Sequence, residues 1–157
     1  MKRLTKLEAV LWSVALPGFS QLLAGSYIKG ILFIILEFLI NVNSNFNDAI
    51  RYSFLGEFES ATNVIEFGWL MFYPCLYMFA MWDAYRMAMR SDEKFAYLPF
   101  VFGAYFITVG LMLSTKIHLF GLYLGPIFLP MLSLLPGLLV GFLLRFCLLK
   151  LYPSPPD

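Results

Sequence analysis

The sequence carries little charge, and this lack excludes a soluble globular domain. Charged residues make up only 13 % of the 157 residues and hydrophobic residues 61 %, whereas soluble domains carry about 25 % charged residues. No basic cluster supports nucleic-acid binding either. We therefore expect one all-α integral membrane domain over residues 1–152, followed by a disordered, Pro-rich tail over residues 153–157.

The sequence is also poor in the residues that build catalytic and metal sites. Its single histidine, His118, excludes a centre made of several histidines. Its two cysteines, Cys75 and Cys147, lie in apolar runs without a CxxC spacing. No HExxH motif, phosphate-binding loop or Ser–His pairing is present. We predict a protein that is not an enzyme and that binds no metal and no cofactor.

The long apolar runs predict where the chain crosses the membrane. A helix needs about 20 apolar residues to cross the hydrocarbon core. We expect about four crossings, at residues 28–43, 65–85, 96–115 and within 119–149. Three prolines interrupt the last run, which we interpret as an interfacial piece followed by a helix from residue 128; two short helices are the alternative.

The first apolar run, residues 7–24, is broken by Pro17–Gly18. If this run crossed the membrane, the basic residues near residue 90 would lie outside, although Lys and Arg gather in cytoplasmic loops. If it instead forms a re-entrant or interfacial hairpin, only Arg51 and Lys116 lie outside, and both termini are cytoplasmic. A cleaved signal peptide is the competing interpretation. We predict a hairpin in a multi-pass protein of a bacterial plasma membrane.

The segment between the first two crossings predicts an amphipathic helix on the outer surface, over residues 44–64. Its apolar residues recur at steps of three or four, and polar residues fall between them. Gly56 marks a break near its middle. The helix either offers a lid or docking surface to an outer partner or only caps the bundle.

The residues LPGFSQ at 16–21, then Gly25, Lys29 and Gly30, and later WDAYR at 82–86 form a recognisable order. In this order, residues 9–88 resemble small bacterial membrane proteins related to the TM2-domain family. Ser20 stands where a second glycine is usual, and a long insert separates the two halves of the pattern. The resemblance implies a membrane scaffold module and no defined chemistry.

Polar residues inside the apolar runs are the candidates for a functional role. Glu37 lies near mid-membrane depth, where an ionised side chain costs roughly 2.5 to 3.5 kcal/mol. We expect a protonated, hydrogen-bonded packing acid there rather than part of a proton or cation path. Asp83 is expected to pair with Arg86 or Lys29 and to lock residues 65–85 against the hairpin. Gln21 is expected to bond a freed backbone group at the break.

Glycines predict close backbone contacts. Gly18, Gly25 and Gly30 permit sharp turns or close approach. Two further pairs at a spacing of four predict helix-packing faces and assembly: Gly121 with Gly125, and Gly137 with Gly141.

From these features we predict a non-catalytic membrane subunit or scaffold. Its partners would be membrane lipids and either a second copy of the chain or another membrane protein. The alternative is a small transporter or channel component that uses the carboxylate of Glu37 inside the membrane.

Overall fold

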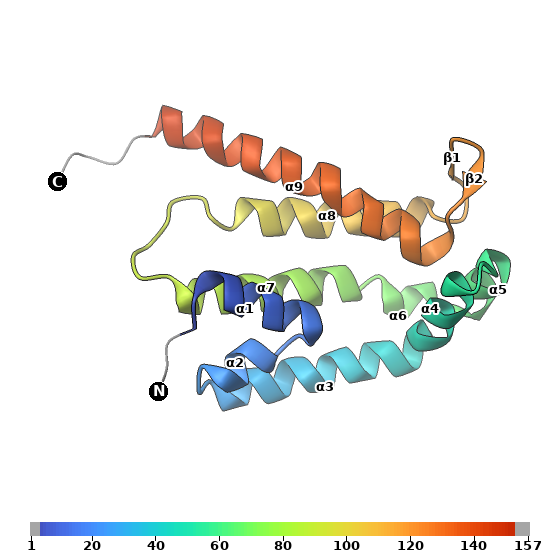
Figure 1. Cartoon of the computed structure of the whole chain (residues 1–157), viewed down its shortest axis with the longest axis horizontal. Coiled ribbons are helices and arrows are strands. Elements are labelled where there is room, and N and C mark those ends of the chain that lie inside the picture. Colours follow the sequence, from blue (N-terminus) through green and yellow to red (C-terminus); the bar gives the residue numbers. More distant parts are fainter. Residues whose placement is uncertain (1–3, 153–157) are drawn as a thin grey trace.

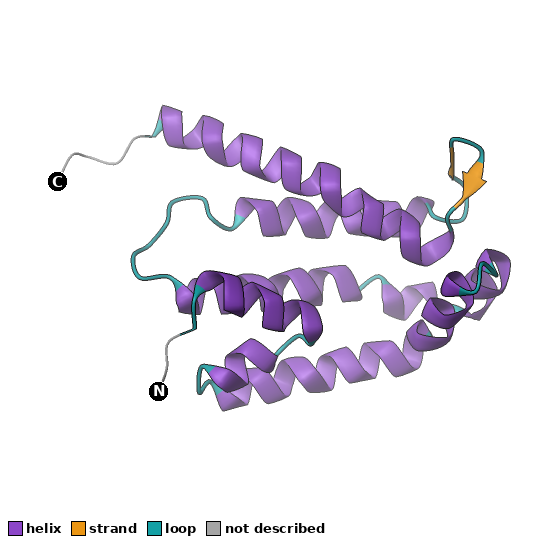
Figure 2. Ribbon diagram, in the orientation of Figure 1, coloured by secondary structure: helices purple, strands orange, loops and turns teal. Residues whose placement is uncertain are grey.

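The computed structural model describes residues 4–152, and most of these residues form helices. The helices are α1 (Lys6–Ala15), α2 (Phe19–Leu23), α3 (Tyr27–Ser44), α4 (Phe46–Phe54), α5 (Phe58–Val64), α6 (Phe67–Leu70), α7 (Tyr73–Ala88), α8 (Leu98–Leu113) and α9 (Gly125–Leu151). A two-stranded antiparallel hairpin, β1 (His118–Leu119) and β2 (Leu122–Tyr123), precedes α9 (Figure 2). The predicted all-α class is confirmed. The predicted tail lies outside the described residues.

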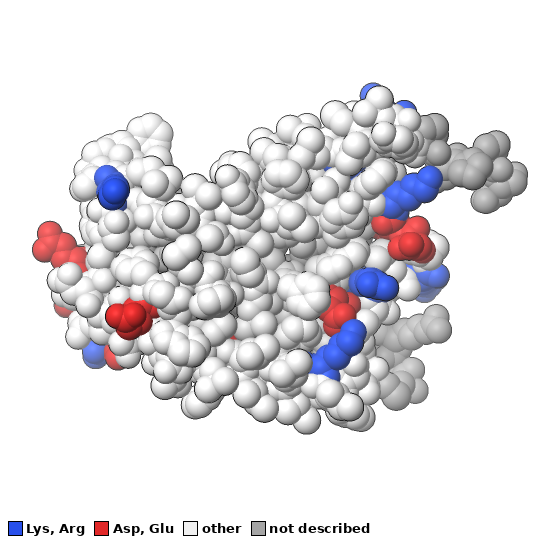
Figure 3. Space-filling model, turned by 180° about the vertical axis from the view of Figure 1, so that it is seen from behind, with Lys and Arg blue, Asp and Glu red and all other residues white. Residues whose placement is uncertain are grey.

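The long helices run side by side between the two ends of the molecule (Figure 1). Figure 1 places the start of α1, the start of α3, the α7–α8 loop and the end of α9 at one end, which we call the basic end. The other end carries α4, α5 and the β-hairpin, which we call the outer cap. The space-filling view shows charged side chains gathered at both ends and a band with almost no charge between them (Figure 3).

This distribution and the length of the helices identify a membrane protein. By length and composition, α3 and α9 can each cross a bilayer. A third span is possible if the bent pair Phe58–Val64 and Phe67–Ala88, which meet at 87°, is counted as one. Because α8 is a shorter apolar helix, four crossings stay a prediction.

The N-terminal hairpin consists of α1, α2 and the turn between them. Thr5 and Glu8 start α1 with a capping box. The helix has 10 residues and is therefore about 15 Å long, roughly half of a 30 Å hydrocarbon core. The chain reverses at Pro17–Gly18, where Gly18 has a φ of 97°. The backbone thus bends where the sequence predicts a break; a position inside the membrane stays a prediction.

The outer cap differs in part from the predicted helix over residues 44–64. Two helices, α4 and α5, replace it, and Gly56 lies in the break with a φ of 80°. Their apolar side packs on the ends of α8 and α9 in a buried cluster of Ala49, Ala61, Ile65, Leu70, Leu111 and Ile127. Phe54, one of the apolar residues that recur at steps of three or four in this segment, is instead 70 % exposed.

Residues 119–149 divide into a short first piece and one long helix, as the sequence predicts. The first piece, residues 118–123, is a β-hairpin, whose position at the membrane interface stays a prediction, and α9 begins at Gly125, a few residues before the predicted start near residue 128. Phe120 and Gly121 form the two-residue turn, with φ values of 52° and 81°, as type I′ hairpin turns require. Beyond this point α9 continues through Pro130 and Pro136 as one helix.

The two predicted glycine faces have different outcomes. Gly121 lies in the hairpin turn and Gly125 at the left-handed start of α9, so the prediction that they share a helix face is wrong. Gly137 and Gly141 do lie on one face of α9, but α8 covers it. A Cβ at Gly141 would come within 2.5 Å of Pro99 Cα. This face therefore joins two helices of the same chain and is not available for assembly.

Candidate functional site

The candidate site is the group of polar contacts that joins the N-terminal hairpin to α3 and α7 near the basic end. Asp83 on α7 is its centre. Its Oδ1 lies 2.7 Å from Nζ of Lys29 on α3, and its Oδ2 accepts a hydrogen bond of 3.2 Å from Nε2 of Gln21 on α2. The expected ion pair with Lys29 is confirmed. Arg86 forms no ion pair within residues 4–152.

Gln21 is fully buried and bridges α2 to α7. Its Nε2 also donates to the carbonyl oxygen of Ala80 at 2.8 Å, whereas its Oε1 has no hydrogen-bond partner. The sequence predicts that Gln21 bonds a freed backbone group at the Pro17–Gly18 break. The bonded carbonyl belongs instead to α7, so Gln21 holds the hairpin to its neighbour.

The glycines bring the hairpin close enough for these contacts. A Cβ at Gly18 would lie 2.4 Å from the carbonyl oxygen of Gly30, and a Cβ at Gly30 would lie 2.5 Å from Leu22 Cδ2. Gly25, at a φ of 83°, ends α2 and turns the chain into α3. The predicted close approach is therefore confirmed for Gly18 and Gly30, and the predicted turn for Gly25.

Hydroxyl groups bond backbone carbonyls of α1 within the hairpin. Ser20 Oγ donates to the carbonyl oxygen of Ala9 at 2.6 Å, and Ser13 Oγ donates to the same oxygen at 2.8 Å. The hydroxyl of Tyr77 on α7 donates to the carbonyl oxygen of Val14, one of the last four carbonyls of α1, which lack partners within that helix. A broken helix inside a bilayer needs such partners.

A second polar contact group lies at the basic end, around Glu93 in the α7–α8 loop. Glu93 pairs with Lys6 of α1 and, at 3.1 Å, with Arg145 of α9. It also accepts a hydrogen bond of 3.2 Å from the hydroxyl of Tyr85 on α7. Sequence reasoning missed Glu93, because a carboxylate beside Asp92 and Lys94 looks like one of several solvated loop charges.

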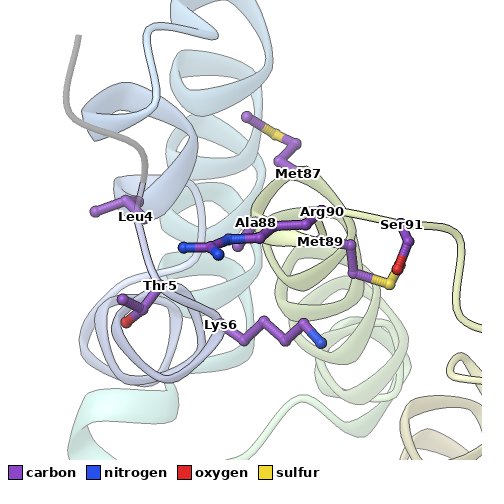
Figure 4. Close-up of a pocket in the computed structure, with 8 residues that line it drawn as sticks. All are labelled: Leu4, Thr5, Lys6, Met87, Ala88, Met89, Arg90 and Ser91. Atoms are coloured by element: carbon purple, nitrogen blue, oxygen red, sulfur yellow. The ribbon is translucent and has the colours of Figure 1, made fainter.

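Two adjoining hollows open beside this group. One, of about 540 Å³, is lined by Trp82, Met89, the acidic residues Asp92 and Glu93, and basic residues of the loop. The other, of about 810 Å³, lies between the start of α1 and the end of α7, and Figure 4 shows the side chain of Arg90 reaching across it.

Glu37 contacts α7 in the middle of the bundle. The hydroxyl of Tyr73 donates to Oε1 of Glu37 at 3.5 Å, and the ring of Tyr73 lies 5.5 Å from that of Tyr77. Within residues 4–152, Glu37 has no ion-pair partner, and no group of His, Cys, Asp and Glu suits a metal ion. Its predicted role as a hydrogen-bonded packing acid fits this contact.

Comparison of the chain with protein-family models, with curated proteins and with solved structures found no match. The resemblance to the TM2-domain family therefore stays a prediction.

Proposed function

We propose that the protein is a non-catalytic membrane subunit or scaffold, which assembles with another membrane protein or with a second copy of itself. The observation that carries this proposal is the use of its polar side chains in contacts between its own helices. Gln21, Asp83 and Lys29 bind one another across three helices, and Tyr77 caps α1. These groups hold the bundle together instead of lining a path or meeting at a reaction centre.

The outer cap is the surface that we assign to a partner. Within it, a hydrogen bond of 2.7 Å between Thr62 and Tyr123 joins α5 to the β-hairpin. Although it carries the charges of Asp48, Glu57 and Glu59, it also exposes large apolar side chains: Phe54 is 70 % exposed, Leu55 65 % and Phe120 97 %. Exposed apolar groups beside charges are typical of an interaction surface.

The test is to tag the C-terminus, extract the protein in a mild detergent and measure what remains bound at stoichiometric level by mass spectrometry. We expect one membrane partner or a defined oligomer. Phe120→Ser should release a partner bound at the outer cap. It should leave the fold intact, because the exposed side chain of Phe120 packs on nothing in the turn. Phe38→Ser, in the exposed face of α3, is the matched control. Recovery of a monomer alone would contradict the proposal.

A transporter or channel component is the second candidate, and the contact between Glu37 and Tyr73 favours it. A carboxylate in mid-span is by default a hypothesis for an ion path. The test is a pH-dependent ion flux into liposomes that contain the purified protein. A flux that disappears in Glu37→Gln and persists in Glu66→Gln would rank this candidate above the scaffold.

A further inference from the structure

The hollow beside the α7–α8 loop contains more positive charge than the chain neutralises. Arg86, Arg90 and Lys94 all line it. Within residues 4–152, no carboxylate lies within ion-pair distance of any of these three side chains. They belong to one short segment, so their positive charges lie close together.

The acidic residues of the hollow do not offset this charge. Glu93 faces Lys6 and Arg145, which pair with its two oxygens, and it also accepts the hydroxyl of Tyr85. Among the acidic residues of the described chain that line this hollow, only Asp92 is left to oppose the three cations. The hollow is therefore cationic, and it would attract a phosphate group.

Aromatic side chains place this hollow at the membrane surface. The ring of Trp82 lies 6.2 Å from that of Tyr97 and 6.1 Å from that of Tyr85. Trp and Tyr concentrate at the level of the lipid headgroups. Trp82 lines the hollow near the end of α7, so the cations face the depth at which lipid phosphates lie.

The adjoining hollow adds apolar side chains to a lining that is also polar. Three residues line both hollows: Met89, Arg90 and Ser91. The second hollow is also lined by apolar Leu4, Met87 and Ala88 and by polar Thr5 and Lys6. Figure 4 shows Arg90 extending toward the segment of Leu4 and Thr5, with Met87 and Met89 on the α7 side. A ligand with a phosphate and an apolar body would fit the two together better than a free anion.

We propose that the two hollows form a binding site for an anionic phospholipid, with its phosphate held by Arg86, Arg90 and Lys94. Basic pockets beside spanning helices recognise such headgroups. The site is independent of the subunit proposed above: it needs a membrane around the protein but no protein partner. A bound lipid would also contact α1 and α7 at once and so hold the N-terminal hairpin against the bundle.

The experiment is native mass spectrometry of the purified protein in detergent, titrated with phosphatidylglycerol and, separately, with phosphatidylcholine. We expect a preference for phosphatidylglycerol. Each Lys or Arg beside an anionic headgroup contributes about a fivefold gain in affinity, so Arg90→Gln should weaken binding about fivefold. R86Q/R90Q/K94Q should weaken it about a hundredfold. The matched control R51Q/K116Q removes cations from the outer cap and should change nothing.

Several results would overturn the proposal. One is equal affinity for both lipids in the unchanged protein. Another is an unchanged preference in Arg90→Gln. Arg90 is exposed, so this single substitution keeps the fold even if the triple variant unfolds. A third is competition by glycerol phosphate at the same concentration as the lipid, which would assign the hollow to a soluble phosphate. Loss of the preference in R51Q/K116Q would show general attraction to the protein surface instead of a site.

Discussion

Asp83 joins three helices through two side-chain contacts, and its surroundings explain why a carboxylate is needed there. Its side chain is 14 % exposed, whereas that of Lys29 is 53 % exposed. The cation thus remains partly hydrated, which limits what the pair contributes. Gln21 is fully buried, so loss of its acceptor would leave a donor with only the carbonyl of Ala80. At this site the buried amide depends more on Asp83 than the lysine does.

Asp83→Asn is expected to lower the free energy of unfolding by about 1 to 2 kcal/mol, because it removes an ion pair and weakens the hydrogen bond from Gln21. Unfolding in mixed detergent micelles measures this. A double-mutant cycle with Lys29→Gln should give a coupling of about 0.5 kcal/mol or more. Additive losses from the two substitutions would show that the pair does not lock α3 to α7.

Gly18→Ala is expected to destabilise the protein by about 2 to 4 kcal/mol. The new methyl group would meet the carbonyl oxygen of Gly30 at 2.4 Å, and the left-handed backbone adds strain. Gly56→Ala is the control: its φ of 80° is similar, but no atom lies within 4 Å. It should lose only the strain, about 1 to 2 kcal/mol. Equal losses in the same unfolding experiment would argue against close packing of the hairpin on α3.

Single residues also show what the sequence can reveal. The pair of Asp83 and Lys29 could be predicted, because both are charged residues at the ends of apolar runs that the positive-inside rule places on one side. Glu93 could not be predicted as a partner of Lys6 and Arg145. Those residues are 87 and 52 positions away in the chain, and only the packed helices bring them together.

Among the elements, the contact of α8 with α9 is the most extensive helix pair of the described chain. It depends on small residues: Gly137 faces the carbonyl oxygen of Phe102, and Gly141 faces the backbone of Pro99. In a bilayer, where apolar surface gains little from burial, such close backbone contact supplies much of the attraction between helices.

Gly141→Ala is therefore expected to lower the free energy of unfolding by about 1 to 3 kcal/mol, because the methyl group would lie 2.5 Å from Pro99 Cα. Gly68→Ala in α6 is the control, since a Cβ there meets nothing within 4 Å, and it should cause no loss. The oligomeric state in gel filtration should not change in either variant. If a variant at Gly141 keeps full stability but dissociates an oligomer, this face joins copies of the chain instead of packing on α8.

The elements that escaped prediction are short or depend on packing. The β-hairpin has two residues in each strand, too few for an alternating pattern, and its only local signal is the Phe120–Gly121 turn. The prolines leave two short helices open as the alternative to one helix, and α9 is continuous. Each internal proline removes a single hydrogen bond, and the contact with α8 supports the helix on both sides of Pro136. Periodicity and turn residues predicted the division near Gly56, which needs no distant partner.

At the scale of the whole molecule, the segregation of charge implies an orientation. The basic end contains the cations of the described chain except Arg51 and Lys116, which belong to the opposite end. Lys and Arg concentrate in cytoplasmic loops, so we predict that the basic end is cytoplasmic and the outer cap is outside. In this orientation α8 crosses the membrane outward and α9 crosses it back, so that the α7–α8 loop and the end of α9 lie on the same side.

This orientation can be measured by labelling with a membrane-impermeant maleimide, after Cys75 and Cys147 are replaced by alanine. In intact cells, Glu59→Cys in the outer cap should react, whereas Lys150→Cys at the end of α9 should react only after permeabilisation. Lys116→Cys decides the role of α8, whose 16 residues span about 24 Å, less than the usual 30 Å core. Reaction in intact cells means that α8 crosses, through local thinning of the bilayer or short flanking turns. Protection at Lys116→Cys together with reaction at Glu59→Cys would place the β-hairpin within the membrane and reduce the number of crossings.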